Sequence, residues 1–296
     1  MNWPTSDLSS DAMHEFRVQV GPAAFRIGSQ WKRPLDQLAE LYRDYPVPAI
    51  PDYTVRLEPV SLLRRFVRQS VAINGDYMLP DAAPLPLAQG LLAAEMAMNL
   101  QMALGWRRHL LLHASAVEKD GKALIMTGQS GSGKSTLAAM LGHRGWRFMG
   151  DEFVLVDLDS GDAVPFPRLI SLKNQAIGAM LATALDGRFG PLMPATPKGD
   201  IRHLVPPSDA IAHMARPAKP ALLLFPSFGF DPAVRDVAPS EVFMRLTQAS
   251  TNYVALGERG FTTLTRFVQT VPARAIDYRD GIEAEALVNQ LWAECA

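Results

Sequence analysis

The feature that most constrains this chain is a glycine-rich segment between an apolar run and a helix-like run. The segment has the pattern G-x-x-x-x-G-K-S, and its members are Gly128, Gln129, Ser130, Gly131, Ser132, Gly133, Lys134 and Ser135. The apolar run 123–126 before it predicts a strand, and residues 136–141 after it, beginning with Thr136, predict a helix. This context is the one in which the pattern forms a phosphate-binding loop. We therefore predict an α/β fold built around a nucleotide-binding P-loop.

The residue types in this loop suit the phosphates of a nucleoside triphosphate. Glycines let the backbone curl until successive N–H groups point at phosphate oxygens. The helix that follows directs its positive N-terminal end at the same phosphates. We expect Lys134 to reach the β- and γ-phosphates and Ser135 to ligate Mg²⁺. The predicted ligands are therefore ATP, bound by residues 128–136, and Mg²⁺.

An acidic pair, Asp151 and Glu152, follows the loop helix closely and has apolar residues on both sides. A P-loop protein needs a carboxylate near the metal, and one of two adjacent acids can serve the ion while the other accepts the proton of an attacking hydroxyl. Asp157, which ends the next apolar run, is a rival metal ligand. We rank it second because Gly161 soon closes a turn that should carry it away.

The N-terminal part, residues 1–86, mixes short strand-like runs with turns and is predicted to be a smaller α+β region of unknown role. Alternation across 16–27 predicts one hairpin, and the Asn74-Gly75 pair predicts the turn of a second. Residues 34–45 carry apolar side chains at helical spacing. The proline-rich stretch 82–86 marks the predicted boundary.

The second part, residues 87–296, is predicted to be the domain that contains the P-loop. It begins with an apolar helix over 87–103, and two strands over 110–117 and 123–127 then form a hairpin. His113 falls inside the first of these strands. A lone histidine in an apolar run is more often a hydrogen-bonded core residue than a catalytic one.

Composition and charge exclude several classes of partner. The chain has 296 residues, is 48% hydrophobic and carries a formal net charge of −1. This balance predicts neither a nucleic-acid partner nor a membrane partner. Cys295 is the only cysteine, the N-terminus lacks the pattern of a signal peptide, and no apolar stretch approaches the roughly 20 residues that span a bilayer. We expect a cytoplasmic protein in a reducing compartment.

The segment that contains the loop resembles the corresponding segment of the HPr kinase/phosphorylase family. The likeness covers 113–156 and consists of His113 before a hairpin, the glycine-rich loop, Arg144 to Arg147, and the acidic pair after Gly150. The whole chain resembles, more diffusely, the subgroup called HPr kinase-related kinase A. The cues for this subgroup lie in segments 20–27, 41–46, 111–114, 165–168 and 171–174 and at Glu95 with Asn99.

The resemblance implies a P-loop core of the HPr kinase type and an ATP-dependent kinase that phosphorylates a Ser or Thr hydroxyl of a small protein or peptide. It makes Glu152 the acceptor of the hydroxyl proton, Asp151 its metal-side partner, and His113 and Lys134 active-site residues. This chain departs from the family at the acidic pair, which is Asp-Glu here and Asp-Asp there. Gln175 stands where the family's second metal-binding signature would supply an acid. Without that acid, the resemblance implies neither the second metal contact nor the phosphorylase activity. The family's later catalytic arginine has no assigned counterpart here, and Arg202 is a guess for it.

Two other functions stay open. A small-molecule kinase could use the same core, with residues 194–200 as a lid. A regulatory or assembly module could instead bind ATP without transferring phosphate, and the departures at Glu152 and Gln175 support this interpretation. The N-terminal region does not resemble the family's regulatory domain, so the family's hexamer is not implied and a homo-oligomer is left open.

Overall fold

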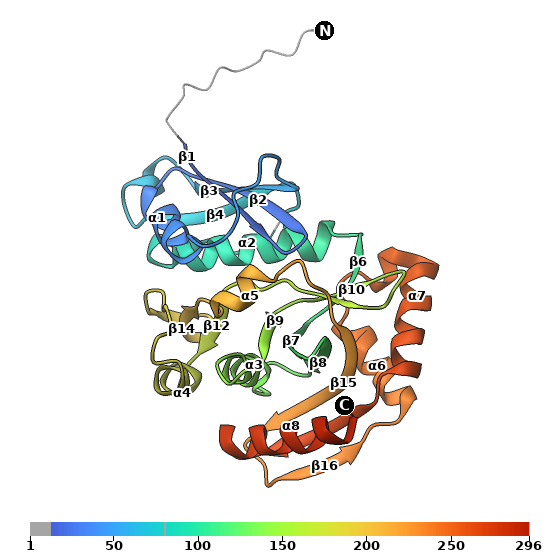
Figure 1. Ribbon diagram of the computed structural model, residues 1–296. Helices are drawn as coiled ribbons and strands as arrows, with labels where there is room; N and C mark the ends of the chain where they lie inside the picture. Colours follow the sequence, from blue (N-terminus) through green and yellow to red (C-terminus); the bar gives the residue numbers. More distant parts are fainter. Residues whose placement is uncertain (1–12, 80, 296) are drawn as a thin grey trace.

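The computed structural model describes residues 13–79 and 81–295 and is a mixed α/β protein with several sheets (Figure 1). The first sheet has the strand order β1-β2-β3-β4-β5. Its strands are β1 (His14–Val20), β2 (Ala23–Ser29), β3 (Tyr53–Pro59), β4 (Ser70–Gly75) and β5 (Leu85–Pro86). The hairpin predicted across 16–27 is confirmed, because β1 and β2 pair antiparallel.

Two helices pack on this first sheet. Helix α1 (Lys32–Leu41) buries Leu35, Leu38 and Leu41, which recur at intervals of three and so form one apolar face. Helix α2 (Gly90–Gly105) follows the 3₁₀ turn η2 (Leu87–Gln89) and contacts α1, β3 and β4. It is apolar on most sides because it also lies against the rest of the chain (Figure 1). The domain division at residue 86 stays a prediction.

The second large sheet has the strand order β16-β17-β15-β8-β7-β9. Its strands are β7 (Ala114–Lys119), β8 (Lys122–Thr127), β9 (Arg147–Gly150), β15 (Lys219–Phe228), β16 (Ala233–Asp236) and β17 (Ala273–Tyr278). The three central strands β8, β15 and β17 run parallel, and the other pairings are antiparallel. The carboxyl end of a central strand is the usual place for a ligand site in such a sheet.

Helices cover both faces of this sheet. Leu124 and Met126 face a core shared with α3 (Lys134–Gly142) and α8 (Gly281–Cys295). Ala123 and Ile125 face the opposite core, which contains α6 (Pro239–Ala249) and α7 (Tyr253–Thr270). This alternation with a period of two explains why 123–126 is an uninterrupted apolar run, since both faces of the strand are buried.

Two three-stranded sheets complete the molecule. One has the order β11-β10-β6 and the other β12-β14-β13. Their strands are β6 (His109–Leu112), β10 (Val154–Asp157), β11 (Ala163–Val164), β12 (Ile170–Lys173), β13 (Met193–Thr196) and β14 (Gly199–Leu204). Helix α4 (Gln175–Thr183) follows β12, and α5 (Ser208–Ala212) follows β14. No helix within the described ranges is long and apolar enough to cross a membrane.

Two local predictions were wrong. The strand predicted over 110–117 is two strands, β6 and β7, which separate at His113 and enter different sheets. The hairpin turn predicted at Asn74-Gly75 is also absent, because Gly75 ends β4 and β4 pairs with β3 and β5. The backbone of Tyr77 bonds instead to the Gln101 side chain, with N–H to Oε1 and Nε2 to carbonyl oxygen both 2.9 Å. A side chain of α2 therefore takes the place of a strand partner.

Candidate functional site

The glycine-rich loop connects the end of β8 to the start of α3, as the sequence predicts. Gly131 and Gly133 adopt left-handed backbone angles, with φ of 87° and 91°. A Cβ at Gly133 would collide with the Tyr278 hydroxyl, which donates a hydrogen bond to the carbonyl oxygen of Ser132 at 3.1 Å. Glycine is therefore required at position 133 both by conformation and by close approach.

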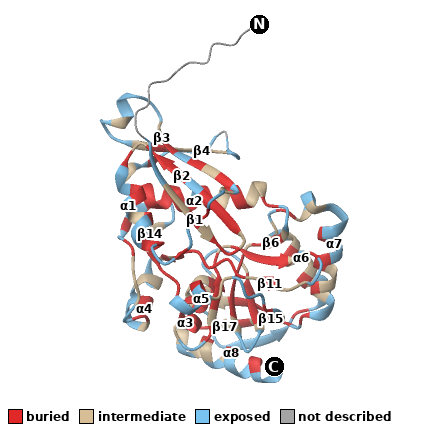
Figure 2. Cartoon of the chain, turned by 45° about the horizontal axis from the view of Figure 1, so that its top comes forward, coloured by how far each residue is buried: buried red, intermediate tan, exposed pale blue. Residues whose placement is uncertain are grey.

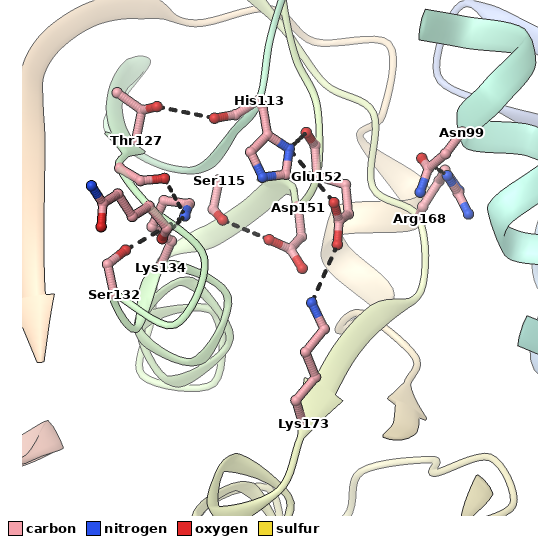
Figure 3. A network of polar contacts seen from close by, with 12 residues as sticks. Asn99, His113, Ser115, Thr127, Ser132, Lys134, Asp151, Glu152, Arg168 and Lys173 are labelled. Atoms are coloured by element: carbon pink, nitrogen blue, oxygen red, sulfur yellow. Dashed lines mark hydrogen bonds and ion pairs between the residues drawn. The ribbon is translucent and has the colours of Figure 1, made fainter. Parts of the chain in front are cut away.

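Lys134 lies buried at the inner side of this loop. Its Nζ donates to the carbonyl oxygens of Gly128 and Gln129, at 2.8 and 2.9 Å (Figure 3). Burial lowers the pKa of Lys134, while the nearby charges of Asp151 and Glu152 raise it. The ammonium thus has the loop's own carbonyl oxygens as acceptors, and phosphate oxygens are acceptors of the same kind.

Asp151 directly follows β9 and is buried beside the loop. The Ser115 hydroxyl donates to its Oδ1 at 2.6 Å, but its buried Oδ2 has no hydrogen-bond partner among the described residues. Burial and the neighbouring Glu152 raise the pKa of Asp151, and the Ser115 hydroxyl lowers it less. Since a buried carboxylate oxygen is costly without a partner, this arrangement suits a cation held between Asp151 and Ser135.

Glu152 has a left-handed backbone, with φ of 70°, which is uncommon for a residue with a Cβ. His113 Nδ1 donates to the Glu152 carbonyl oxygen at 3.0 Å and lies 3.6 Å from Oε2. Lys173 Nζ lies 3.9 Å from Oε1 (Figure 3). The Glu152 carboxylate is therefore placed between a histidine and a lysine. Strained backbone of this kind concentrates at functional sites.

His113 occupies the point where β6 and β7 diverge. Its backbone N–H donates to Ala249 at 2.7 Å, and its carbonyl oxygen accepts from the Thr127 hydroxyl at 3.0 Å. With its backbone fixed in this way, the half-exposed side chain faces Glu152 and is not a core histidine.

A cavity of about 790 Å³ connects these groups. The loop, Asp151, Glu152 and His113 line one part of it. Further polar lining residues include Ser171, Lys173 and Asn174, which sequence reasoning did not place at the site, and Lys198 of the segment predicted as a lid. The alternation of β12 places Ser171 and Lys173 on one face of that strand, which is the only local signal for Lys173.

Other candidates lie outside this cavity or lack the expected chemistry. The Asp157 carboxylate accepts from the backbone N–H groups of Asp159 and Ser160, at 3.0 and 2.8 Å, so it caps a turn and its pKa is lowered. Arg202 lies over the Phe189 ring and is not among the lining residues. Gln175 does line the cavity. Within residues 13–79 and 81–295, no three acids, histidines or cysteines gather as a metal cluster.

A buried polar cluster lies between α2 and the β11–β12 connection. Its members are Tyr42, Glu95, Asn99 and Arg168, which all belong to the sequence cues for the kinase A subgroup. Arg168 donates to the Glu95 carbonyl oxygen at 2.8 Å and also contacts the Glu95 carboxylate. It contacts the Asn99 side chain as well (Figure 3). The Tyr42 hydroxyl donates to Glu95 Oε1 at 2.9 Å. These contacts join α1 and α2 to the chain segment just before the cavity wall.

Comparison with known proteins adds little to this geometry. No protein-family model matches the chain, and no curated protein matches it. One solved structure that is similar in part is that of the Hpr(Ser) kinase/phosphatase from Coxiella burnetii. It is 14% identical, the match covers 62% of this chain and 98% of that chain, and the TM-score is 0.27. Because so slight a likeness indicates at most a distant relation, the interpretation of the site rests on its own contacts.

Proposed function

We propose that this protein is an ATP-dependent kinase of the HPr kinase-like type, which transfers the γ-phosphate to a Ser or Thr hydroxyl of a small protein or peptide. The observation that carries the proposal is the environment of Asp151. One buried oxygen of its carboxylate is held by Ser115, and the other has no partner among the described residues and lies beside the glycine-rich loop. A metal-side acid and a second carboxylate, Glu152, thus line the cavity into which the loop opens.

The loop would bind the triphosphate through its backbone N–H groups and the N-terminus of α3. Lys134 would exchange the carbonyl oxygens of Gly128 and Gln129 for phosphate oxygens. Ser135 and Asp151 would hold Mg²⁺, which typically takes one or two carboxylates and completes its shell with phosphates and water. Bound Mg²⁺ would supply neutralisation of the charge on the β- and γ-phosphates.

Glu152 would accept the proton of the acceptor hydroxyl. The acceptor oxygen then forms a bond to the γ-phosphorus, the bond to the β–γ bridging oxygen breaks, and ADP leaves with that oxygen. Lys173, at 3.9 Å from Oε1, and His113, at 3.6 Å from Oε2, would hold the Glu152 carboxylate in place at the cavity.

A small-molecule acceptor is the second candidate, and the cavity rim gives it some support. Segment 194–200, predicted as a lid, forms the turn of the β13–β14 hairpin and places Lys198 at the cavity. The hairpin is held there by Asn174, whose Oδ1 accepts from the Asp200 N–H at 3.1 Å. A rim of this kind could enclose a small acceptor as well as border a peptide.

Phosphoryl transfer from labelled ATP, with Mg²⁺, tests the proposal. Ser- and Thr-containing peptides, small proteins and hydroxylated metabolites are offered as acceptors, and ADP release is compared with and without each one. Acceptor-dependent transfer that Glu258→Gln, a change at an exposed glutamate on α7, leaves intact would support a kinase. ATP binding without transfer to any acceptor would favour the regulatory or assembly module.

A further inference from the structure

The connection between β3 and β4, residues 60–69, exposes a group of large apolar side chains far from the cavity. These side chains are Val60, Leu62, Leu63, Phe66 and Val67, with Leu62 83% and Phe66 73% exposed. Figure 2 shows exposed residues where the chain continues beyond β3, at the end of the molecule opposite α8. A contiguous apolar group of this size is unusual on a surface that meets only water.

The backbone of the 60–69 loop is well ordered by hydrogen bonds. It contains the 3₁₀ turn η1 (Leu63–Arg65), extended by a bond from the Val67 N–H to the Leu63 carbonyl oxygen at 2.9 Å. The carbonyl oxygen of Arg65 accepts from Trp31 Nε1 at 3.2 Å and from Gln69 Nε2 at 2.9 Å. The apolar side chains are therefore presented by a fixed turn, and little ordering entropy would be lost on binding.

The polar residues of the same loop are basic. Arg64, Arg65 and Arg68 stand here, and the sequence has no acid between Pro59 and Asp76. The Arg65 guanidinium lies over the Phe66 ring, 5.4 Å from its centroid, and Arg64 Nη1 donates to the Arg68 carbonyl oxygen at 3.3 Å, so basic and apolar side chains are interleaved on the loop. No carboxylate of the described residues pairs with Arg64 or Arg68. The loop surface is thus apolar and positive at the same place.

We propose that the 60–69 loop binds an anionic lipid surface. Leu62, Leu63 and Phe66 would enter the boundary between headgroups and acyl chains, and Arg64 and Arg68 would contact lipid phosphates and carboxylates. A lipid surface offers apolar depth and negative charge together to an exposed turn, whereas a protein partner would need an acidic rim around a matching hollow. The net charge of −1, which predicted no membrane partner, conceals this local charge because acids elsewhere offset it.

The geometry leaves the proposed active site accessible during such binding. The first sheet and its 60–69 loop lie at one end of the molecule, and α8, which helps to line the cavity, lies at the other (Figure 1). Attachment through the loop would hold the protein at a surface with the cavity open to solvent. The proposal does not depend on what the cavity binds.

Vesicle co-sedimentation of the full chain tests this proposal. We expect the protein to pellet with vesicles of phosphatidylcholine plus phosphatidylserine, to remain in solution with pure phosphatidylcholine, and to be released by salt. Phe66→Asp should weaken the binding about tenfold or more, because it removes an inserted apolar side chain. Arg64→Glu should remove the preference for phosphatidylserine. Val254→Asp is the matched control, since Val254 is 87% exposed on α7, outside the loop.

Three results would overturn the proposal. One is the absence of sedimentation with anionic vesicles, and another is equal binding by wild type and Phe66→Asp. The third is a concentration-dependent dimer in sedimentation velocity that Phe66→Asp abolishes, which would make the loop an interface between copies of the chain. Thermal melting and ATP binding of each variant show that the fold is intact.

Discussion

Replacing Asp151 by asparagine should stabilise the nucleotide-free protein while impairing it as a metal-binding protein. Burial and Glu152 raise the pKa of Asp151 above its ordinary value of 3.8. Between the ordinary and the raised pKa the folded protein binds more protons than the unfolded chain, so stability falls as pH rises through the raised pKa. The amide introduced by Asp151→Asn carries no charge and should escape this loss. The asparagine Nδ2 would still lack a partner, but a buried charge without a partner costs more than a neutral group, so a gain of about 1–3 kcal/mol is expected.

Thermal unfolding across neutral and mildly acidic pH, with and without MgATP, measures this effect. Each kcal/mol of added stability should raise the melting temperature by roughly 2–4 °C for a protein of this general size. With MgATP present, wild type should melt at a higher temperature than Asp151→Asn, because wild type gains stability from a ligand that the variant binds less well. Asp157→Asn is a control that should lower the melting temperature at neutral pH. Backbone hydrogen bonds lower the pKa of Asp157, so its ionised carboxylate stabilises the folded protein. A nucleotide-free Asp151→Asn that melts below wild type at every pH would refute the reasoning.

Three further changes test separate parts of the account. Lys134→Ala should weaken ATP binding about tenfold or more, because charge-assisted contacts contribute roughly 1.5–3 kcal/mol, and unchanged affinity in calorimetry would exclude the phosphate-loop interpretation. Ser135→Ala should weaken ATP binding more with Mg²⁺ than with EDTA, and equal losses would count against a metal ligand. Arg168→Ala leaves the buried Glu95 carboxylate without its cation and should lower the free energy of unfolding by about 3–5 kcal/mol in urea titrations. A loss below about 1 kcal/mol would show that the pair is not structurally important.

The strand–loop–helix unit could be predicted because its signals are local. Glycines at fixed positions, an apolar run before them and a helix-forming run after them all fall within residues 123–141. Asp151 and Glu152 are also close in sequence, so their place beside the loop followed from the short β9 connection. Two features of the acidic pair could not be predicted: the lack of a hydrogen-bond partner for Asp151 Oδ2 and the left-handed backbone of Glu152. Both depend on how other segments pack around the pair.

The parts that sequence reasoning missed depend on contacts between distant segments. The strand break at His113 arises because β6 pairs with β10 while β7 pairs with β8 and β9, and an apolar run contains no signal for such a division. Lys173 comes from a three-stranded sheet whose strands were not predicted. The Glu95–Arg168 pair joins residues 73 positions apart, so the family cues identified its members without revealing that they touch.

Phosphoryl transfer by Glu152→Gln is the measurement that tests the central claim most directly. Glutamine keeps the shape of the side chain between His113 and Lys173 but cannot take a proton. With any acceptor that wild type phosphorylates, transfer should fall about 10²–10⁴-fold, the usual contribution of general base catalysis, while ATP binding stays nearly normal. Full turnover by Glu152→Gln would contradict the account, because the base would then lie elsewhere, with Asp151 as the first candidate.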